Sequence, residues 1–542
     1  MHQSRHQIDG EFIATGALLS VVAVIGLATF RDYGIATDEF NMNVQGAKFL
    51  AWFTSGFTDT SWLNDVDAKF YGAWFDTLIA YVQSLQDAAP FDVRHGITFL
   101  VSLAGLATVV PLGRLAMGRW AGFTAIALCL STGYFYGQMF FSPVDMPFMA
   151  TMNWALLAIL LMARRPVPSW PATICAGLLT GLAIGTRIGG VLSQVYLVAA
   201  MLLTGLDVIL RQGRAGADML ARIAARSIAA IIIGWAVALA IWPWLQGSNP
   251  LARLAAAFKF FSRIYLDFPF RHWGREVHSL SLPWDYVPEQ FLARLSEAFL
   301  LMLGLAAIFG AVWLLRFAWA CVRRARLHGT QGLRAPALLL TRSRGLLIVT
   351  MAAVVPFLII LVTRPTLYDG FRHLIFVVPL LALLAGWALH RLLPLLRRFP
   401  MVFAILGGVQ LGVAVVTMAT LHPLEYIATN SFAGRTQGSY GRFDLDYWSE
   451  AATVAVRRLE QRLDYKFGRD ATAPHILVCI PWREYLVQPM FRRPWIVETD
   501  PQKADFIIET ERAACAHGAG TVIDEVKRYD RVFARTIDMG QR

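Results

Sequence analysis

Long runs of apolar residues alternate with short polar segments along most of the chain. The first run, residues 12–30, reads FIATGALLSVVAVIGLATF, and a mostly polar stretch follows it over 31–95. About 20 helical residues cross the hydrocarbon core of a bilayer, so runs of this length predict transmembrane helices. The first run has no small-residue cleavage site and the length of a complete span, which indicates a retained helix rather than a signal peptide.

The apolar runs predict a mainly α-helical, polytopic membrane protein with about eleven spans. These spans cover 12–30, 96–112, 121–139, 147–163, 171–186, 188–206, 227–244, 298–316, 345–362, 374–389 and 401–421. The region 171–206 leaves two interpretations open, because GLAIGTRIGG is compatible with a tight turn between two helices and with a break inside one.

Composition agrees with this class, since 56% of the residues are hydrophobic and 16% are charged. The net charge of +12 comes from arginines that cluster in short segments between the apolar runs, including Arg114/Arg119, Arg164/Arg165, Arg211/Arg214 and Arg323/Arg324/Arg326. Such clusters are typical of cytoplasmic loops, and we do not expect a nucleic-acid partner. An odd number of spans then places the N-terminus in the cytoplasm and the C-terminus outside.

Two domains are predicted on this topology. The first, 1–421, holds the membrane spans and two large outer loops at 31–95 and 245–297. Within the first loop, 41–53 and 71–85 have apolar residues at helical spacing and predict helices lying along the interface. The second domain, 422–542, combines the helical DYWSEAATVAVRRLEQRL with the strand candidates HILVCI, DFIIET and RVFARTID, so we expect a small extracytoplasmic α/β domain.

Cysteine usage leaves a question about this tail. Cys479 and Cys515 are its two cysteines. A disulfide between them, if the tail faces an oxidising compartment, and two unpaired thiols are both compatible with the sequence.

Acidic residues stand where the chain leaves the first and third spans. Asp38 and Glu39 follow the first span in TDEF, and Asp145 stands in FSPVDMPF between two prolines, which place it on a rigid turn. Each acid also has an interpretation that involves no function. Asp38 and Glu39 could be solvated acids in a loop, and Asp145 could cap the next helix. The three acids together on the outer side instead indicate a site.

Basic residues accompany these acids on the same side. Arg187 lies in GTRIGG, Arg94 is followed by His95 at the end of the first loop, and Arg372 is followed by His373 directly before a span. Any one of these arginines is explained by snorkelling to the interface. Three of them near the paired acids predict a site for an anionic head group, because guanidinium matches phosphate in a bidentate fork.

Acids and arginines at the membrane surface suit glycosyl transfer from a lipid-linked sugar phosphate. A base removes the proton of an acceptor hydroxyl, the hydroxyl attacks the anomeric carbon, and cations hold the departing phosphate. No nucleotide-binding glycine loop is present in the sequence, which agrees with a donor supplied by the membrane.

These residues resemble the GT-C glycosyltransferases of the protein O-mannosyltransferase and aminoarabinose-transferase type. The motifs that carry the resemblance, in order, are TDEF, SPVDMPF, GLAIGTRIGG, LPWDYVP, LYDGFRHLIFVVP, HPLEYIATN and GSYGRFDLDYW. Val144 departs from the family, in which a lysine commonly precedes the aspartate of the proline-rich turn.

The resemblance implies a polyprenyl-phosphate-sugar donor and a hexosyl or pentosyl transferase of the bacterial inner membrane. It implies that Asp38, with Glu39 beside it, is the catalytic base and that Asp145 supports the acceptor or a metal. The residues expected at the donor phosphate are Arg187, Arg372, His373, Arg94 and Tyr368. No cofactor is assured; a divalent metal ion stays open, because the acids and histidines form no recognisable ligand spacing. The sugar and the acceptor, whether protein, glycan or lipid, are not specified.

Two other functions compete with this hypothesis. A polytopic transporter or lipid flippase would use the same acids and arginines for coupling or substrate binding. However, the two halves show no repeat, and the polar groups gather on one side. A catalytically silent relative whose tail binds other proteins would carry its acidic pair exposed and outside any pocket.

Overall fold

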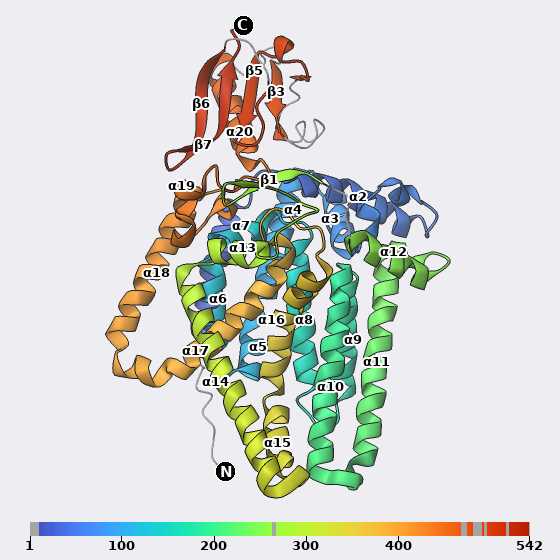
Figure 1. Ribbon diagram of the computed structural model, residues 1–542. Coiled ribbons are helices and arrows are strands. Elements are labelled where there is room, and N and C mark those ends of the chain that lie inside the picture. The colour runs from blue at the N-terminus through green and yellow to red at the C-terminus, as the bar shows by residue number, and fades with distance from the viewer. Residues whose placement is uncertain are drawn as a thin grey trace.

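The computed structural model describes residues 10–262, 267–467, 474–480, 490–492, 496–515 and 520–540. A bundle of long helices forms most of the molecule, and a small sheet with one helix lies beyond one end of the bundle (Figure 1). Several short helices and a hairpin lie between the bundle and this sheet (Figure 1).

Apolar helices make up the bundle. They are α1 (Gly10–Thr29), α4 (Pro90–Ala107), α5 (Val109–Ala116), α6 (Ala121–Leu130), α7 (Gly133–Phe141), α8 (Asp145–Met162), α9 (Trp170–Ile184), α10 (Val191–Gln212), α11 (Ala217–Ile241), α14 (Glu297–His328), α15 (Arg334–Arg342), α16 (Arg344–Thr363), α17 (Val378–Arg398) and α18 (Pro400–Leu421). Within the described residues, eight stretches are long and apolar enough to cross a membrane by length and composition, and one of them, Ile188–Ile241, contains both α10 and α11. The shorter apolar helices α6 and α9 account for the other predicted spans. The prediction of a polytopic, mainly α-helical membrane protein is confirmed.

Two details of the span prediction are resolved by the structure. The predicted span 121–139 is two helices, α6 and α7, and all residues of α7 are buried. A Cβ on Gly137 would lie 2.6 Å from the backbone nitrogen of Tyr426, so α7 lies directly beneath the chain that follows α18. In the region 171–206, α9 and α10 are separate helices joined through a short 3₁₀ turn, Ile188–Gly190, so the interpretation as a turn is the correct one.

The first long loop, 31–95, contains helices at the two predicted places. They are α2 (Thr37–Thr54) and α3 (Trp74–Ser84), and they pack against each other. The later long loop, 245–297, forms α12 (Pro250–Ser262), an antiparallel hairpin of β1 (Pro269–His272) and β2 (Arg275–His278), and α13 (Tyr286–Arg294). All of them lie at the end of the bundle that faces the sheet (Figure 1).

The tail has the predicted α/β composition. Its described helices are the short α19 (Arg435–Ser439) and the longer α20 (Glu450–Phe467), and its described strands are β3 (His475–Cys479), β4 (Ile496–Val497), β5 (Phe506–Thr510), β6 (Thr521–Arg528) and β7 (Arg531–Asp538). The strand order is β4-β3-β5-β7-β6, with β3 parallel to β4 and β5, and β7 antiparallel to β5 and β6. The division into domains at 421/422 stays a prediction.

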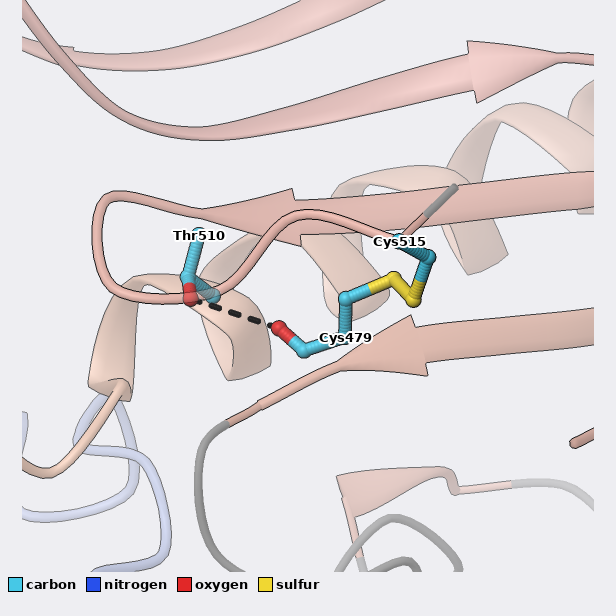
Figure 2. The surroundings of a disulfide bond; sticks show 3 residues. All are labelled: Cys479, Thr510 and Cys515. Carbon is cyan, nitrogen blue, oxygen red and sulfur yellow. Dashed lines mark hydrogen bonds between the residues drawn. A yellow bond between two sulfur atoms is a disulfide. The ribbon is translucent and has the colours of Figure 1, made fainter. Parts of the chain in front are cut away.

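A disulfide joins Cys479 at the end of β3 to Cys515, with their Cα atoms 5.8 Å apart (Figure 2). The hydroxyl of Thr510 donates a hydrogen bond of 3.3 Å to the carbonyl of Cys479 beside this bond (Figure 2). Of the two alternatives for the tail cysteines, the disulfide is the one found. The other three cysteines, Cys129, Cys175 and Cys321, are free.

Candidate active site

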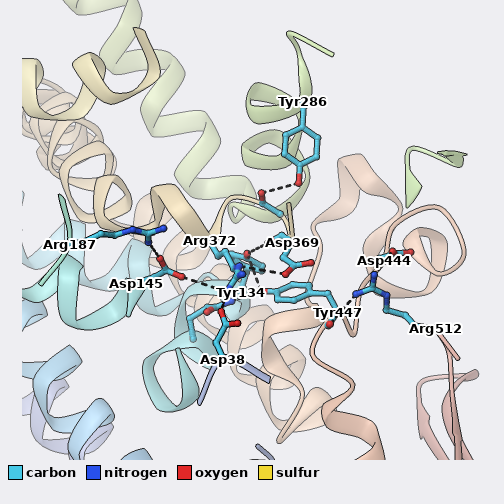
Figure 3. A network of polar contacts seen from close by, with 12 residues as sticks. Asp38, Tyr134, Asp145, Arg187, Tyr286, Asp369, Arg372, Asp444, Tyr447 and Arg512 are labelled. Carbon is cyan, nitrogen blue, oxygen red and sulfur yellow. Dashed lines mark hydrogen bonds and ion pairs between the residues drawn. The ribbon is translucent and has the colours of Figure 1, made fainter. Parts of the chain in front are cut away.

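A cavity of about 380 Å³ lies where the two long loops, the bundle and the tail meet. Its charged lining residues are Asp38, Asp65, Asp67, Asp145, Arg187, Asp369 and Arg372. They come from segments far apart in the sequence, namely the first loop, α8, the turn before α10 and the loop before α17. Figure 3 shows how most of these side chains converge.

Asp38 and Glu39 lie in the first turn of α2, where negative charge is favoured by the helix dipole. The Glu39 carboxylate is fully buried and turned away from the cavity, because it accepts a hydrogen bond of 3.1 Å from the backbone N–H of Ala36 and contacts His95 Nε2 at 3.1 Å. The Asp38 side chain is 36% exposed and lines the cavity. Glu39 therefore anchors the start of α2, and Asp38 is the member of the pair that can meet a substrate.

Asp145 is the first residue of α8, and it lines the cavity together with Val144. Its carboxylate forms a hydrogen-bonded ion pair with Arg187 (Figure 3). Arg187 stands in the turn between α9 and α10, against which the first loop packs closely. Gly72 makes this approach possible, because a Cβ there would lie 1.6 Å from the carbonyl oxygen of Gly185.

Arg372 is the cation at the centre of the site. Its guanidinium pairs with Asp38, lies 3.5 Å from a carboxylate oxygen of Asp369, and is 4.0 Å from one of Asp145 (Figure 3). The guanidinium also lies over the rings of Tyr368, at 4.9 Å, and Trp448, at 5.4 Å. The side chain is 4% exposed, so contacts on several sides hold it in place.

His373 and Tyr368 complete the part of the cavity next to Arg372. Their rings meet edge to face with centroids 4.9 Å apart. The Nδ1 atom of His373 is buried and has no hydrogen-bond partner within the described chain.

Asp369 is held close to Arg372 by a left-handed turn. Asp369 has φ = 58° and Gly370 φ = 75°, and a Cβ on Gly370 would lie 2.8 Å from the hydroxyl oxygen of Tyr134. The hydroxyls of Tyr134 and Tyr286 donate hydrogen bonds to the carbonyls of Asp369 and Gly370 at 3.0 and 3.1 Å (Figure 3). Burial raises the pKa of the Asp369 carboxyl to about 6, although Arg372 and Arg512 oppose the rise.

The tail contributes aromatic residues to the cavity. Tyr447 and Trp448 line it, and the Tyr447 carbonyl accepts a hydrogen bond of 3.0 Å from Arg512, which follows β5 and also pairs with Asp444 at 3.2 Å (Figure 3). The C-terminal sheet is thus joined directly to the wall of the site.

Six of the eight residues singled out from the sequence line one cavity. They are Asp38, Asp145, Arg187, Tyr368, Arg372 and His373. The structure places the other two elsewhere: Glu39 caps α2, and Arg94 is fully buried in an ion pair with Asp76 at 2.8 Å, which ties α4 to α3.

Sequence reasoning did not assign Asp369, Tyr71, Tyr447 or Trp448, all of which line the cavity. Asp369 carries a usable signal, since an acid three residues before Arg372 in YDGFR is placed to meet it. The aromatic residues carry none, because their partners in the cavity come from distant segments.

A metal site is not formed by the described residues, among which no group of three or more His, Cys, Asp or Glu side chains is arranged to hold an ion. The carboxylates of Asp38 and Asp145 are instead paired with guanidinium groups. What the arrangement offers chemically is a carboxylate able to accept a proton, next to two arginines able to bind an anion.

No family model matches the chain, and no curated protein matches it.

Among solved structures it is similar to ArnT from Cupriavidus metallidurans bound to undecaprenyl phosphate, with 15% identity and a TM-score of 0.46 over 97% of this chain and 98% of that one. It is also similar to the oligosaccharyltransferase AglB from Archaeoglobus fulgidus in complex with an inhibitory peptide and a dolichol-phosphate, with 11% identity and a TM-score of 0.44 over 92% of this chain and 69% of that one. A third similarity is to the mycobacterial arabinofuranosyltransferase AftD, with 13% identity and a TM-score of 0.36 over 97% of this chain and 40% of that one.

Proposed function

We propose that the protein transfers a hexosyl or pentosyl group from a polyprenyl-phosphate-linked donor to an acceptor hydroxyl at the outer face of the membrane. The observation that carries the proposal is the pairing of Asp38 with Arg372 inside one cavity at the end of the helical bundle. That pairing brings a carboxylate base and an anion-binding guanidinium to the same reacting centre.

In the proposed reaction Asp38 accepts the proton of the acceptor hydroxyl as the hydroxyl oxygen attacks the anomeric carbon. The bond between that carbon and the phosphate oxygen breaks, and the polyprenyl phosphate leaves with the electron pair. Arg372 and Arg187 stabilise the negative charge of the leaving group. A single displacement inverts the configuration at the anomeric carbon.

Arg187 is paired with Asp145, and Arg372 is paired with Asp38. A donor phosphate would take the place of carboxylates at the guanidinium groups. Loss of its arginine partner would leave Asp38 free to act on the acceptor, so donor binding and base activation are coupled in this scheme.

The position of the cavity favours an enzyme over a transporter. Loop and tail residues line much of it, among them Asp65, Tyr71, Phe268 and Trp448, whereas transporter sites lie near the bilayer midplane. A catalytically silent protein would carry its acidic pair outside any pocket, but Asp38 lines the cavity.

We infer that the cavity and the tail face the outside of a bacterial inner membrane, with the N-terminus in the cytoplasm. The disulfide between Cys479 and Cys515 supports this placement, because such bonds persist in oxidising compartments. Acceptor proteins, glycans and lipids would all be accessible there.

Purified protein in lipid nanodiscs, supplied with radiolabelled polyprenyl-phosphate sugars and candidate acceptors, tests the proposal. We expect transfer that depends on one donor and is lost in Asp38→Asn. Absence of transfer with every donor, together with movement of the lipid across vesicles, would favour the flippase instead.

A further inference from the structure

A second charged cavity, of about 340 Å³, lies at the other end of the bundle. Four arginines, Arg164, Arg211, Arg342 and Arg344, and one acid, Asp207, line it. They come from the segment that follows α8, from α10, from α15 and from the start of α16; α15 lies at the end of the bundle farthest from the C-terminal sheet (Figure 1).

Asp207 is already fully engaged in this cavity. Its two carboxylate oxygens accept hydrogen bonds from Nε of Arg211, at 2.8 Å, and from the hydroxyl of Thr341, at 2.7 Å. Arg344 donates through Nη2 to the backbone carbonyl of Arg164 at 3.3 Å, which is an uncharged acceptor, and the charge of Asp207 also acts on it.

The remaining two guanidinium groups are unengaged. In the part of the chain that the structure describes, neither Arg164 nor Arg342 has a side-chain hydrogen bond or ion pair. Among the described residues that line the cavity there are four arginines and one acid, an excess of three positive charges. Like charges around one cavity repel one another, so an anion in the cavity would stabilise the arrangement.

The position of the cavity relative to the membrane indicates the source of that anion. Three apolar stretches that are long enough to cross a membrane end or begin beside it, Pro90–Ala116, Asp145–Met162 and Arg344–Thr363. Its lining also includes apolar residues at these helix ends, Leu115, Leu160 and Ala163. The cavity therefore lies at the border between hydrocarbon and head groups, which is the level of the lipid phosphates.

We propose that this cavity binds the phosphodiester of an anionic membrane phospholipid, with the guanidinium groups on the phosphate and the apolar wall against the start of the acyl chains. The site is separate from the cavity of Asp38 and Arg372 and does not depend on the proposed transferase activity. Its ligand stabilises the contacts among α8, α10, α15 and α16 rather than taking part in a reaction.

The test compares the parent with Arg164→Gln/Arg342→Gln, which removes the two unengaged charges and leaves Asp207 with its partners. The control is Arg324→Gln/Arg326→Gln, which removes the same charge from α14, outside the cavity. Full-length protein is titrated in a neutral detergent with phosphatidylglycerol, with phosphatidylcholine, or with inorganic phosphate alone, and bound lipid is counted by native mass spectrometry.

We expect the parent to retain phosphatidylglycerol in preference to phosphatidylcholine, and the cavity variant to bind it roughly 10- to 30-fold more weakly, the effect of two basic residues at a membrane surface. The control should bind as the parent does, and Arg164→Lys/Arg342→Lys should recover most of the affinity. Melting temperatures without lipid verify that each variant is folded.

Equal retention of both lipids, or equal losses in the cavity and control variants, would overturn the proposal. Inorganic phosphate that competes fully at low millimolar concentration would make this a site for a free anion and would overturn the assignment to a lipid.

Discussion

The backbone N–H of Gly34 donates a hydrogen bond of 2.6 Å to the carboxyl group of Glu450. Glu450 is the first residue of α20, and Gly34 lies just before α2, the helix that carries Asp38. Arg457 of the same α20 donates to the carbonyls of Asp32 and Tyr33 at 2.6 and 2.9 Å. The tail thus holds the segment that positions the proposed base.

Two substitutions of Glu450 should distinguish the effect of its hydrogen bond to Gly34 from the effect of its charge. Burial, together with nearby acids, raises the pKa of Glu450 well above its usual value, so the neutral amide of Glu450→Gln is a close mimic and should behave like the parent. Glu450→Ala leaves the Gly34 N–H buried without a partner, which costs about 1–3 kcal/mol. We expect a lower melting temperature and slower transfer in the alanine variant, measured by thermal unfolding and initial rates. Identical behaviour of the two variants would mean that this contact positions nothing.

Asp38→Asn should reduce turnover by roughly 10²–10⁴-fold, the usual contribution of a positioned base, because the amide cannot accept the acceptor's proton. Glu39→Gln should cost much less, since the amide oxygen can still accept the hydrogen bond from Ala36. Single-turnover rates with unchanged melting temperatures provide the comparison. Full activity in a folded Asp38→Asn protein would move the role of base to Asp145.

Arg372→Lys and Arg187→Lys should each weaken donor binding by about tenfold or more, because lysine keeps the charge and loses the planar fork that matches phosphate. The measurement is the KM for the donor at saturating acceptor. Arg94→Lys is the matched control: Arg94 was predicted from the sequence to bind the same phosphate but is paired with Asp76 outside the cavity. It should change stability and leave the donor KM near that of the parent; a raised KM in this control would bring Arg94 back into the site.

Donor affinity should depend on pH through Asp369. Its pKa of about 6 in the folded protein means that the carboxylate beside Arg372 gains a proton as the pH falls from 7 to 5. Loss of that negative charge makes the site more positive, so a phosphodiester donor should bind more tightly at pH 5 than at pH 7. Asp369→Asn should bind tightly at both values, and a parent-like pH dependence in this variant would exclude Asp369 as its source.

The Asp369 carboxyl should also make the protein more stable at low pH than at high pH. Because its pKa is raised above the usual 3.8, the folded state binds the proton more tightly than the unfolded chain does. Its contribution to stability is present below pH 4 and is lost as the pH rises through about 6. Asp369→Asn should flatten this part of the stability profile, measured by melting temperature against pH.

Sidedness can be tested with single cysteines on a background without native ones. Tyr465 is 95% exposed on α20, and Arg324 lies exposed near the end of α14. An impermeant thiol reagent should label Tyr465→Cys in intact spheroplasts and label Arg324→Cys only after lysis. Labelling in the opposite order would reverse the proposed topology.

The apolar helices, the helices α2 and α3 of the first loop, and the α/β character of the tail could be predicted from the amino-acid sequence. These features follow from local periodicity, because bilayer thickness sets the length of a span and the helical repeat sets which face is apolar. The grouping of Asp38, Asp145, Arg187 and Arg372 was also accessible, since a common side of the membrane restricts these residues to one surface. The contiguous α6 and α7 could not be told apart from one span, because both segments are apolar.

The contacts of each charged residue depend on how distant segments pack together. Asp38 and Glu39 are neighbours in the chain, yet one lines the cavity and the other is buried against His95, because successive helical residues point in different directions. Arg94 pairs with Asp76 for a similar reason, since that partner is supplied by a separate helix. Asp369, Tyr71 and Trp448 reach the cavity through turns and through docking of the tail, and these depend on contacts between segments hundreds of residues apart that local patterns do not encode.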